Sequence, residues 1–165
     1  MSVAQPAPAR AGGRLQLTPP ADCFEFIVVG APPDDGDWPR RPGQVARDAG
    51  GRARLLHFAP GRWLVPDPEA GERARLAALA AAGRGVLVEV SGKWQAVALA
   101  PGVAAAVLAS TLEFEAVLAG REAAAVVLFD CPAILARSGN DFALWVAASY
   151  LASFTRVVDA LRLGD

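Results

Sequence analysis

The chain has 165 residues, of which 53% are hydrophobic, enough for one globular domain and too few for a second full core. Its 16 basic and 17 acidic residues give a formal charge of −1, which argues against a nucleic-acid binder because such proteins need clustered positive charge. No apolar run reaches the ~18 residues that span a bilayer, and residues 1–13 lack the apolar centre of a signal peptide, so we expect a cytoplasmic protein with no membrane partner.

Residues 1–22 are expected to form an N-terminal arm. Ala, Pro and Gly dominate its sequence as far as Pro20 without any periodic pattern, which is typical of a flexible or extended segment. Such an arm can still be ordered by a partner. The remaining residues, 23–165, are predicted to form a single domain.

A strand and a long loop open this domain. Residues 23–29 read Cys-Phe-Glu-Phe-Ile-Val-Val, an aromatic and β-branched run that predicts a strand. Residues 30–51 are dense in Pro, Gly, Asp and Arg and predict a long loop. A loop of this length is longer than most connections inside compact domains, and such loops are either disordered or functional.

A β-hairpin and a helix are predicted next. Residues 54–58 and 63–65 flank Ala59-Pro60-Gly61-Arg62, in which Pro followed by Gly suits the centre of a type II turn. Helix boundary signals follow the hairpin. They are Asp67 as N-cap, Pro68 as the first helical residue and Gly83 as the residue after which the helix stops.

The middle of the chain predicts two more strands and a helix. Residues 85–90 alternate valines with Leu and Glu, which predicts a half-buried strand, and Ser91-Gly92-Lys93 reads as a turn. Residues 94–99 continue as a strand. A helix is expected to open at Pro101 and to run to about Ser110.

The C-terminal third predicts a β-meander closed by a helix. Strands are expected over residues 121–129, 133–137 and 141–148, with turns at Asp130-Cys131-Pro132 and Ser138-Gly139-Asn140. Ser149 is the expected cap of the last helix. The whole succession predicts an α+β fold in which helices cover one face of an antiparallel or mixed sheet.

Several segments within residues 52–163 carry a resemblance to a known family. They are patterns of strand, turn and aromatic residues: 62–65 (Arg-Trp-Leu-Val), 88–91 (Val-Glu-Val-Ser), 94–99, 101–102 (Pro-Gly), 111–114 (Thr-Leu-Glu-Phe), 137–142 (Arg-Ser-Gly-Asn-Asp-Phe) and 146–150 (Val-Ala-Ala-Ser-Tyr). In these segments the chain resembles the gamma subunit of heterotetrameric sarcosine oxidase. That family is itself similar to the folate-binding domain of the glycine-cleavage T-protein, and the resemblance implies the T-protein type of fold.

The resemblance implies a non-catalytic gamma-type subunit of a heteromeric flavoenzyme complex. Such a complex oxidatively demethylates sarcosine or a related methylated amine. Its larger flavoprotein subunits hold FAD, FMN, NAD and tetrahydrofolate, so the resemblance implies these cofactors on partner subunits and none in this chain.

The chain departs from the folate-active pattern at two places. T-proteins carry paired Asp residues entering the strand that corresponds to residues 133–137, whereas this chain reads Phe129-Asp130-Cys131-Pro132 there, with a lone Asp. They also usually carry Asp-Val-Ser-His where this chain has Glu89-Val90-Ser91-Gly92. We therefore expect no folate chemistry in this chain.

The residues themselves predict no catalytic, cofactor or metal site. Glu89 and Asp130 could form a general acid/base pair, but a strand surface and a turn are the commoner places for such carboxylates. His57, among apolar neighbours, is interpreted as a structural strand histidine. Cys131 lacks a basic neighbour that would activate its thiol, and with Cys23 it gives no zinc-ligand spacing. Gly-Ala-Pro-Pro at residues 30–33 lacks the N–H donors of a dinucleotide loop.

The long loop is the predicted partner interface. Trp38 is the aromatic anchor, and Arg40 and Arg41 are charges at its margin, because Trp and Arg are enriched at binding hot spots. We expect this loop and the N-terminal arm to be ordered by a larger subunit. The alternative interpretation is a solvated loop whose Trp38 folds back on its own domain.

Two other functions remain open. The chain could be a stand-alone folate-binding or aminomethyltransferase-like protein, which its length and the missing acid pair disfavour. It could also be a scaffold module unrelated to amines. The sequence does not choose the amine substrate, because the residues that contact the amine would lie on other chains.

Overall fold

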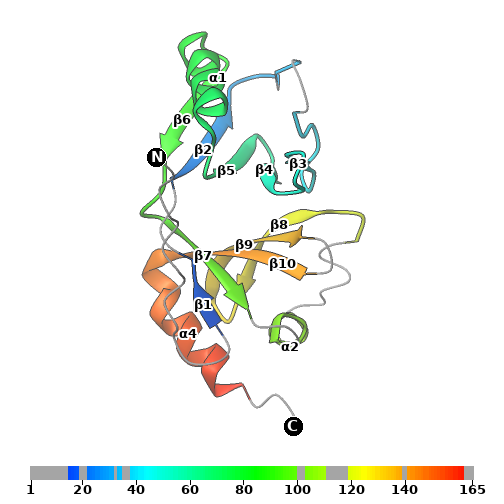
Figure 1. Ribbon diagram of the computed structural model, residues 1–165, viewed down its shortest axis with the longest axis vertical. Coiled ribbons are helices and arrows are strands. Elements are labelled where there is room, and N and C mark those ends of the chain that lie inside the picture. Colours follow the sequence, from blue (N-terminus) through cyan, green and yellow to red (C-terminus); the bar gives the residue numbers. More distant parts are fainter. Residues whose placement is uncertain are drawn as a thin grey trace.

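The computed structural model describes residues 15–18, 22–31, 33–34, 38–99, 103–110, 119–138 and 141–161. They form two five-stranded sheets stacked on each other, with helices on the outer faces (Figure 1). All strand pairs described are antiparallel. The predicted α+β class is confirmed, but the strands divide between two sheets.

The upper sheet has the strand order β3-β4-β5-β2-β6 and is covered by helix α1 (Figure 1). Its elements are β2 (Cys23–Val28), β3 (Val45–Arg47), β4 (Ala53–Ala59), β5 (Arg62–Pro66), α1 (Ala70–Ala81) and β6 (Gly85–Glu89). The β4–β5 hairpin turns at Pro60 and Gly61, and Gly61 has a φ of +69°, as the third residue of a type II turn requires.

The lower sheet has the order β1-β7-β10-β9-β8 and packs against two helices. Its elements are β1 (Leu15–Leu17), β7 (Trp94–Leu99), α2 (Val103–Ala109), β8 (Ala123–Leu128), β9 (Cys131–Ser138), β10 (Asp141–Ala147), the 3-10 helix η1 (Ala148–Tyr150) and α4 (Leu151–Ala160). The turn at Ser91-Gly92-Lys93 carries the chain from β6 in the upper sheet to β7 in the lower one.

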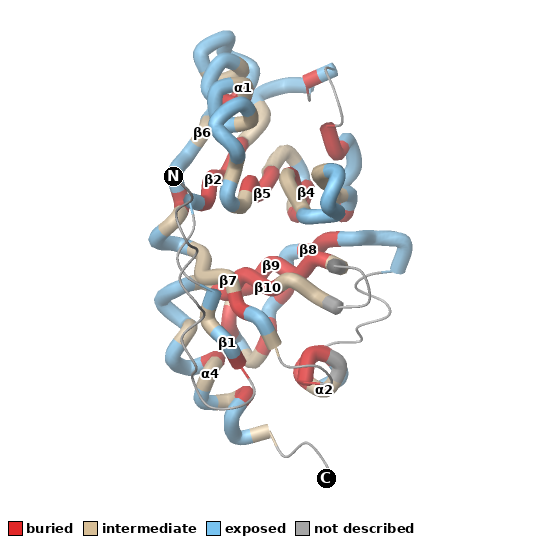
Figure 2. Tube along the Cα trace, viewed as in Figure 1, coloured by how far each residue is buried: buried red, intermediate tan, exposed pale blue. Residues whose placement is uncertain are grey.

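Three apolar clusters give the molecule its layers (Figure 2). Phe26, Trp63 and Leu76 lie between the upper sheet and α1. Leu64 and Ile134 belong to a cluster between the two sheets. A third cluster, which includes Leu135, Val146 and Phe154, lies between the lower sheet and its helices. All the residues named here are at least nine-tenths buried.

The structure corrects the expected arm. Leu15, Gln16 and Leu17 pair in register with Leu99, Ala98 and Val97 of β7, so this part of the arm is a strand of the chain's own lower sheet. Leu15 is buried in the lower cluster. The strand carries a leucine at each end, and both leucines pack against the lower cluster. Their burial and the free edge of β7 favour this pairing.

The sequence correctly predicted the C-terminal end of α1 but not its N-terminal end. The helix ends as predicted, because Gly83 follows it with a φ of +72°. It begins at Ala70 rather than Pro68, and its N-cap is Glu69 rather than Asp67. Asp67 is occupied elsewhere: its N–H donates to the carbonyl oxygen of Asp22 at 2.6 Å, and its carboxylate pairs with Arg52.

Two predictions in the C-terminal third were also wrong. Phe129 and Asp130, both with positive φ, form a two-residue hairpin turn, so Cys131 and Pro132 belong to β9 instead of to the turn. Ser149 lies within η1, and α4 has no side-chain cap. The predicted features at residues 1–14, 101–102, 111–114 and 139–140 lie outside the described residues.

Candidate partner-binding surfaces

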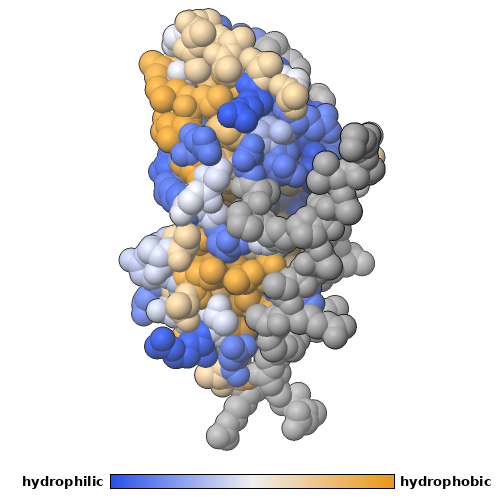
Figure 3. All heavy atoms as spheres, turned by 60° about the vertical axis from the view of Figure 1, so that its left-hand side comes forward, coloured by the Kyte–Doolittle hydropathy of each residue, from blue (hydrophilic) through white to orange (hydrophobic). Residues whose placement is uncertain are grey.

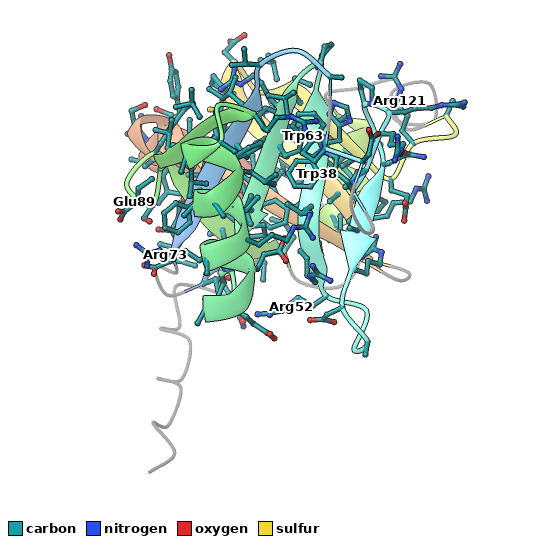
Figure 4. All side chains as sticks on the ribbon, turned by 90° about the horizontal axis from the view of Figure 1, so that it is seen from above. Trp38, Arg52, Trp63, Arg73, Glu89 and Arg121 are labelled. Carbon is teal, nitrogen blue, oxygen red and sulfur yellow. The ribbon has the colours of Figure 1, made fainter. Side chains whose placement is uncertain are left out.

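Trp38, the expected interface anchor, is 4% exposed and packs within its own domain. Its ring lies 5.4 Å from that of Phe26 and 5.3 Å from that of Trp63, and the Arg75 guanidinium is 5.3 Å from its centroid. Figure 4 shows Trp38 and Trp63 side by side next to α1. Because α1 buries only Leu76 and is otherwise rich in Ala, it leaves room for the indole. The alternative interpretation of Trp38 is therefore the correct one.

The loop around Trp38 is held by the chain's own hydrogen bonds. The indole N–H of Trp63 donates to the Pro39 carbonyl at 2.9 Å. The amides of Arg40 and Arg41 donate to the side-chain oxygen of Gln44, each at 2.9 Å. These contacts order residues 38–44 without a partner.

Arg40 and Arg41 keep their predicted exposure. Arg40 is 57% exposed and contacts only the carboxylate of Asp34 among the ion pairs described, at 3.2 Å. Arg41 is also exposed. The two arginines thus lie on the surface without the aromatic anchor, and their role in an interface stays a prediction.

The remaining nucleophile and acid/base candidates are buried or separated. Burial raises the pKa of the Cys23 thiol to about 12, and burial likewise raises the pKa of Cys131, so neither sulfur is ionised near neutral pH. Glu89 and Asp130 belong to different sheets, and no hydrogen bond or ion pair joins them. The described residues contain no group of three or more side chains that could hold a metal ion.

His57 lies in the outer face of the upper sheet, 3% exposed. Its ring stacks on Trp63 with centroids 4.1 Å apart and an angle of 24° between planes. Burial lowers the pKa of His57, so its ring is neutral near pH 7. A ring enclosed in this way has no access to a substrate, in agreement with a structural role.

Glu25 was not singled out by the sequence, yet it joins the two sheets. Its buried carboxylate accepts hydrogen bonds from Lys93 Nζ at 2.8 Å, from the Trp94 indole at 2.9 Å and from the Arg62 guanidinium. Burial would raise the pKa of Glu25, but these hydrogen bonds outweigh it and hold the pKa below its usual value. The sequence feature that indicates this role is a glutamate within the otherwise apolar strand Cys23–Val28.

A polar cavity of about 440 Å³ lies between β4 and the start of α1. It looks suited to an anion because Arg47, Arg52 and Arg54 line it. However, Arg52 pairs with Asp48, Asp67 and Glu69, and Arg54 pairs with Glu72 at 2.6 Å. Arg47 pairs with Glu122, which lies outside the cavity lining, at 3.3 Å. All three arginines therefore have acidic partners, and the cavity offers little free positive charge.

Exposed valines mark one edge of each sheet. Val86 and Val88 on β6 are 50% and 39% exposed, and Val29, which follows β2 beside them, is 61% exposed. Val127 on β8 is 58% exposed. Figure 3, in which the left-hand side of Figure 1 comes forward, shows apolar atoms gathered in patches over both the upper and the lower half of the molecule. No helix among the described residues is long and apolar enough to cross a bilayer.

Comparison with known proteins identifies the fold. No protein-family model matches the chain, and no curated protein is similar to it in sequence. Among solved structures it is similar to a chain of the heterotetrameric sarcosine oxidase from Corynebacterium sp. U-96 in complex with pyrrole 2-carboxylate, with a TM-score of 0.68 and 18% identity. The likeness covers 88% of this chain and 82% of that chain, so the two have similar lengths and share most of their fold.

Proposed function

We propose that this chain is the gamma-type subunit of a heteromeric sarcosine oxidase-like complex. The observation that carries the proposal is the shared fold: 88% of the chain superposes on a chain of similar length from a heterotetrameric sarcosine oxidase. A fold can serve many functions, so the proposal needs support from the chain's own residues. The segments by which the sequence resembles the gamma subunit add such support.

The side-chain chemistry supports a subunit without an active centre of its own. His57 is enclosed by Trp63, and both thiols are buried with raised pKa values. The carboxylate of Glu25 is occupied by two cations and an indole. In the proposed complex the larger subunits bind FAD, FMN, NAD and tetrahydrofolate and oxidise the methylated amine, and this chain supplies binding surface.

Two features of the described residues argue against a dinucleotide or folate site in this chain. Gly30 follows an antiparallel strand and leads into a loop, so no helix N-terminus faces the place where a pyrophosphate would lie. Asp130 lies in a hairpin turn, and β9 begins with Cys131 and Pro132 where T-proteins bring in their paired acids. Both features favour the subunit over a stand-alone folate-binding protein.

The test is to isolate the tagged full-length chain from its native host and to identify what accompanies it. We expect larger subunits in fixed stoichiometry, with a flavin absorbance that sarcosine or a related methylated amine bleaches anaerobically. The same chain produced alone in a foreign host is the control. It should carry no flavin and oxidise no methylated amine.

Two outcomes would contradict the proposal. One is a native chain that purifies alone, or with proteins that hold no flavin. The other is a stoichiometric flavin or amine-oxidising activity on the chain produced alone, because a gamma-type subunit has neither.

A further inference from the structure

β6 forms one edge of the upper sheet, and no described strand pairs with its outer side. Natural proteins usually protect such an edge with a Pro, a bulge or an inward-pointing charge. β6 reads Gly-Val-Leu-Val-Glu, pairs with β2 without a bulge, and exposes Val86 and Val88. The β8 edge exposes a single valine, Val127, whereas the β6 edge combines an unpaired backbone with two exposed valines, as an added strand requires.

The register shows which backbone groups are free. The Val29 amide donates to the Arg84 carbonyl at 3.2 Å, and the Val90 amide donates to the Cys23 carbonyl at 2.7 Å. In an antiparallel pair, residues that exchange hydrogen bonds alternate with residues that do not. The residues that bond to β2 are therefore the even-numbered ones. The N–H and C=O groups of Gly85, Leu87 and Glu89 point away from the sheet.

One face of this edge is apolar. In the register of the sheet, Val86 lies opposite Ile27, and Val88 lies opposite Glu25. Val29 extends the same face beyond the end of β2, because alternate residues of a strand share a face. Together Ile27, Val29, Val86 and Val88 form what we call the β6 patch.

The charges around the β6 patch are mainly positive. Arg84 directly precedes β6, is exposed, and alternates onto the face of Val86. Arg62 lies opposite Ile27 on the same face, and Lys93 borders it. Arg62 and Lys93 are 40% and 48% exposed and share one buried carboxylate, that of Glu25. On this face three cations therefore meet one acid, because Glu89 alternates onto the opposite face, opposite Phe24.

We propose that β6 receives a β-strand from the larger subunit of the complex, and that this strand carries apolar residues opposite Val86 and Val88 and a carboxylate that meets Arg84. The inference rests on the proposed function and adds the place and the chemistry of the contact. The outward groups of Leu87 and Glu89 supply main-chain hydrogen bonds, and the cations select an acidic partner.

A second copy of this chain is a poorer occupant of the edge. If two β6 strands paired antiparallel about Leu87, Arg84 would lie opposite Val90 of the other copy and would find no acid there. The basic faces of the two copies would also lie side by side, which costs binding energy through like-charge repulsion. The charge pattern therefore favours a different, acidic chain.

Hydrogen exchange tests the backbone part of the proposal on the purified native complex and on the free chain. We expect the amides of Leu87 and Glu89 to exchange fast in the free chain and to become protected in the complex. The amides of Val86 and Val88 already bond to β2, so their protection should change much less. Protection of the outward amides in the free chain, through a dimer, would overturn the proposal, as would outward amides that stay unprotected in the complex.

Paired substitutions test the side-chain part. Arg84→Glu and Val86→Glu should each weaken assembly about tenfold or more at low salt, because they set a carboxylate against an acidic strand. Arg121→Glu, at the opposite rim in Figure 4, and Val127→Glu, on the β8 edge, are the matched controls and should assemble normally. All four residues are exposed, so the thermal midpoint of each free variant should match that of the wild type.

Glu89→Pro removes one outward N–H, whereas Glu89→Ala removes the side chain and keeps that N–H. We expect only the proline variant to weaken assembly by several-fold. If the wild-type complex forms and none of the β6 variants weakens it, this inference fails while the proposed function stands. If the wild-type chain joins no flavoprotein complex, the proposed function fails, and this inference fails because it rests on that function.

Discussion

Glu25 is a buried carboxylate that binds groups from both sheets, so its charge has a structural task. A buried ion pair costs desolvation and is strongly destabilised when one partner is lost. Here the cost is limited, because Lys93 and Arg62 are nearly half exposed and water can hydrate them if Glu25 is neutralised. The residue thus connects β2 to the start of β7 at a modest energetic cost.

We expect Glu25→Gln to lower the free energy of unfolding by about 1–2 kcal/mol at neutral pH, through weaker hydrogen bonds to both cations. The folded pKa of Glu25 lies below the ordinary 4.5, so its contribution is complete above 4.5 and is lost as the pH falls through the folded pKa. Thermal unfolding across this range measures both effects. Glu69→Gln, at a carboxylate 80% exposed, is the control. A wild-type advantage that does not shrink in acid would contradict this role.

His57 should make the fold sensitive to mild acid. Burial lowers its folded pKa below the ordinary 6.5, so the unfolded chain takes up a proton first as the pH falls. The stabilising contribution is therefore complete above 6.5 and declines below it, toward the folded pKa. His57→Phe keeps the stack on Trp63 and cannot titrate. Its thermal midpoint should fall less than that of the wild type between pH 7.5 and about 5.5. If the midpoints of the two proteins fell equally over this pH range, groups other than His57 would be responsible for the acid sensitivity.

At the scale of elements, the contact between β2 and β6 depends on the absence of a side chain at Gly85. A Cβ there would lie 2.6 Å from the Ile27 carbonyl oxygen and 2.6 Å from the Phe26 ring, closer than real Cβ contacts allow. The Phe26 ring is fully buried, and the Ile27 carbonyl belongs to the backbone of β2, which is paired on both sides, so neither can move freely. The glycine therefore fixes how closely β6 approaches its neighbour.

We expect Gly85→Ala to destabilise the fold by about 1–3 kcal/mol, because overpacking forces β6 away from β2. Gly92→Ala, in the turn that follows β6, is the control, since nothing lies within 4 Å of its added Cβ. Denaturant unfolding of the two variants gives the comparison. Equal stabilities would mean that β6 can shift without cost and that its register is weakly fixed.

Sequence patterns located most elements but were less reliable at their ends. Gly83 was correctly taken as a stop, because a left-handed residue after a helix is a local requirement that glycine meets. The predicted N-cap role of Asp67 was wrong because its carboxylate accepts a hydrogen bond from Arg52, 15 residues away in the sequence. The turn before β9 lies at residues 129–130 and not at 130–132, because Leu128 pairs with Cys131 and only two loop residues remain. Long-range contacts decided both cases.

At the scale of the whole molecule, the sequence predicted the fold class but not the division into two sheets. The alternation along β6 and β7 is the same whether two strands pair or separate, so only tertiary contacts place them in different sheets. The candidate interface shows the same limit. Trp38 in a polar loop looked like an exposed anchor, but it is buried by Phe26, Trp63 and Arg75, and no pattern in the loop records these contacts.

The two sheets also differ in how their edges are closed. β1 covers β7 at one edge of the lower sheet, and Leu15 inserts into the lower cluster with 2% exposure. The upper sheet leaves β6 open at its corresponding outer edge. The N-terminal segment therefore contributes a strand and a buried side chain to the chain's own lower sheet.

Leu15→Ala tests that contribution. Removing a buried leucine side chain lowers the free energy of unfolding by about 2–4 kcal/mol, because apolar burial is lost and a cavity is left behind. For a chain of this size, each kcal/mol lowers the thermal midpoint by about 2–4 °C. Gln16→Ala, at the exposed position between the two leucines, should leave the midpoint unchanged. The measurement is made on the free chain, because the expectation is that β1 is ordered there. If both variants unfolded like the wild type when free and differed only within a complex, the arm would owe its order to the partner, as the sequence first suggested.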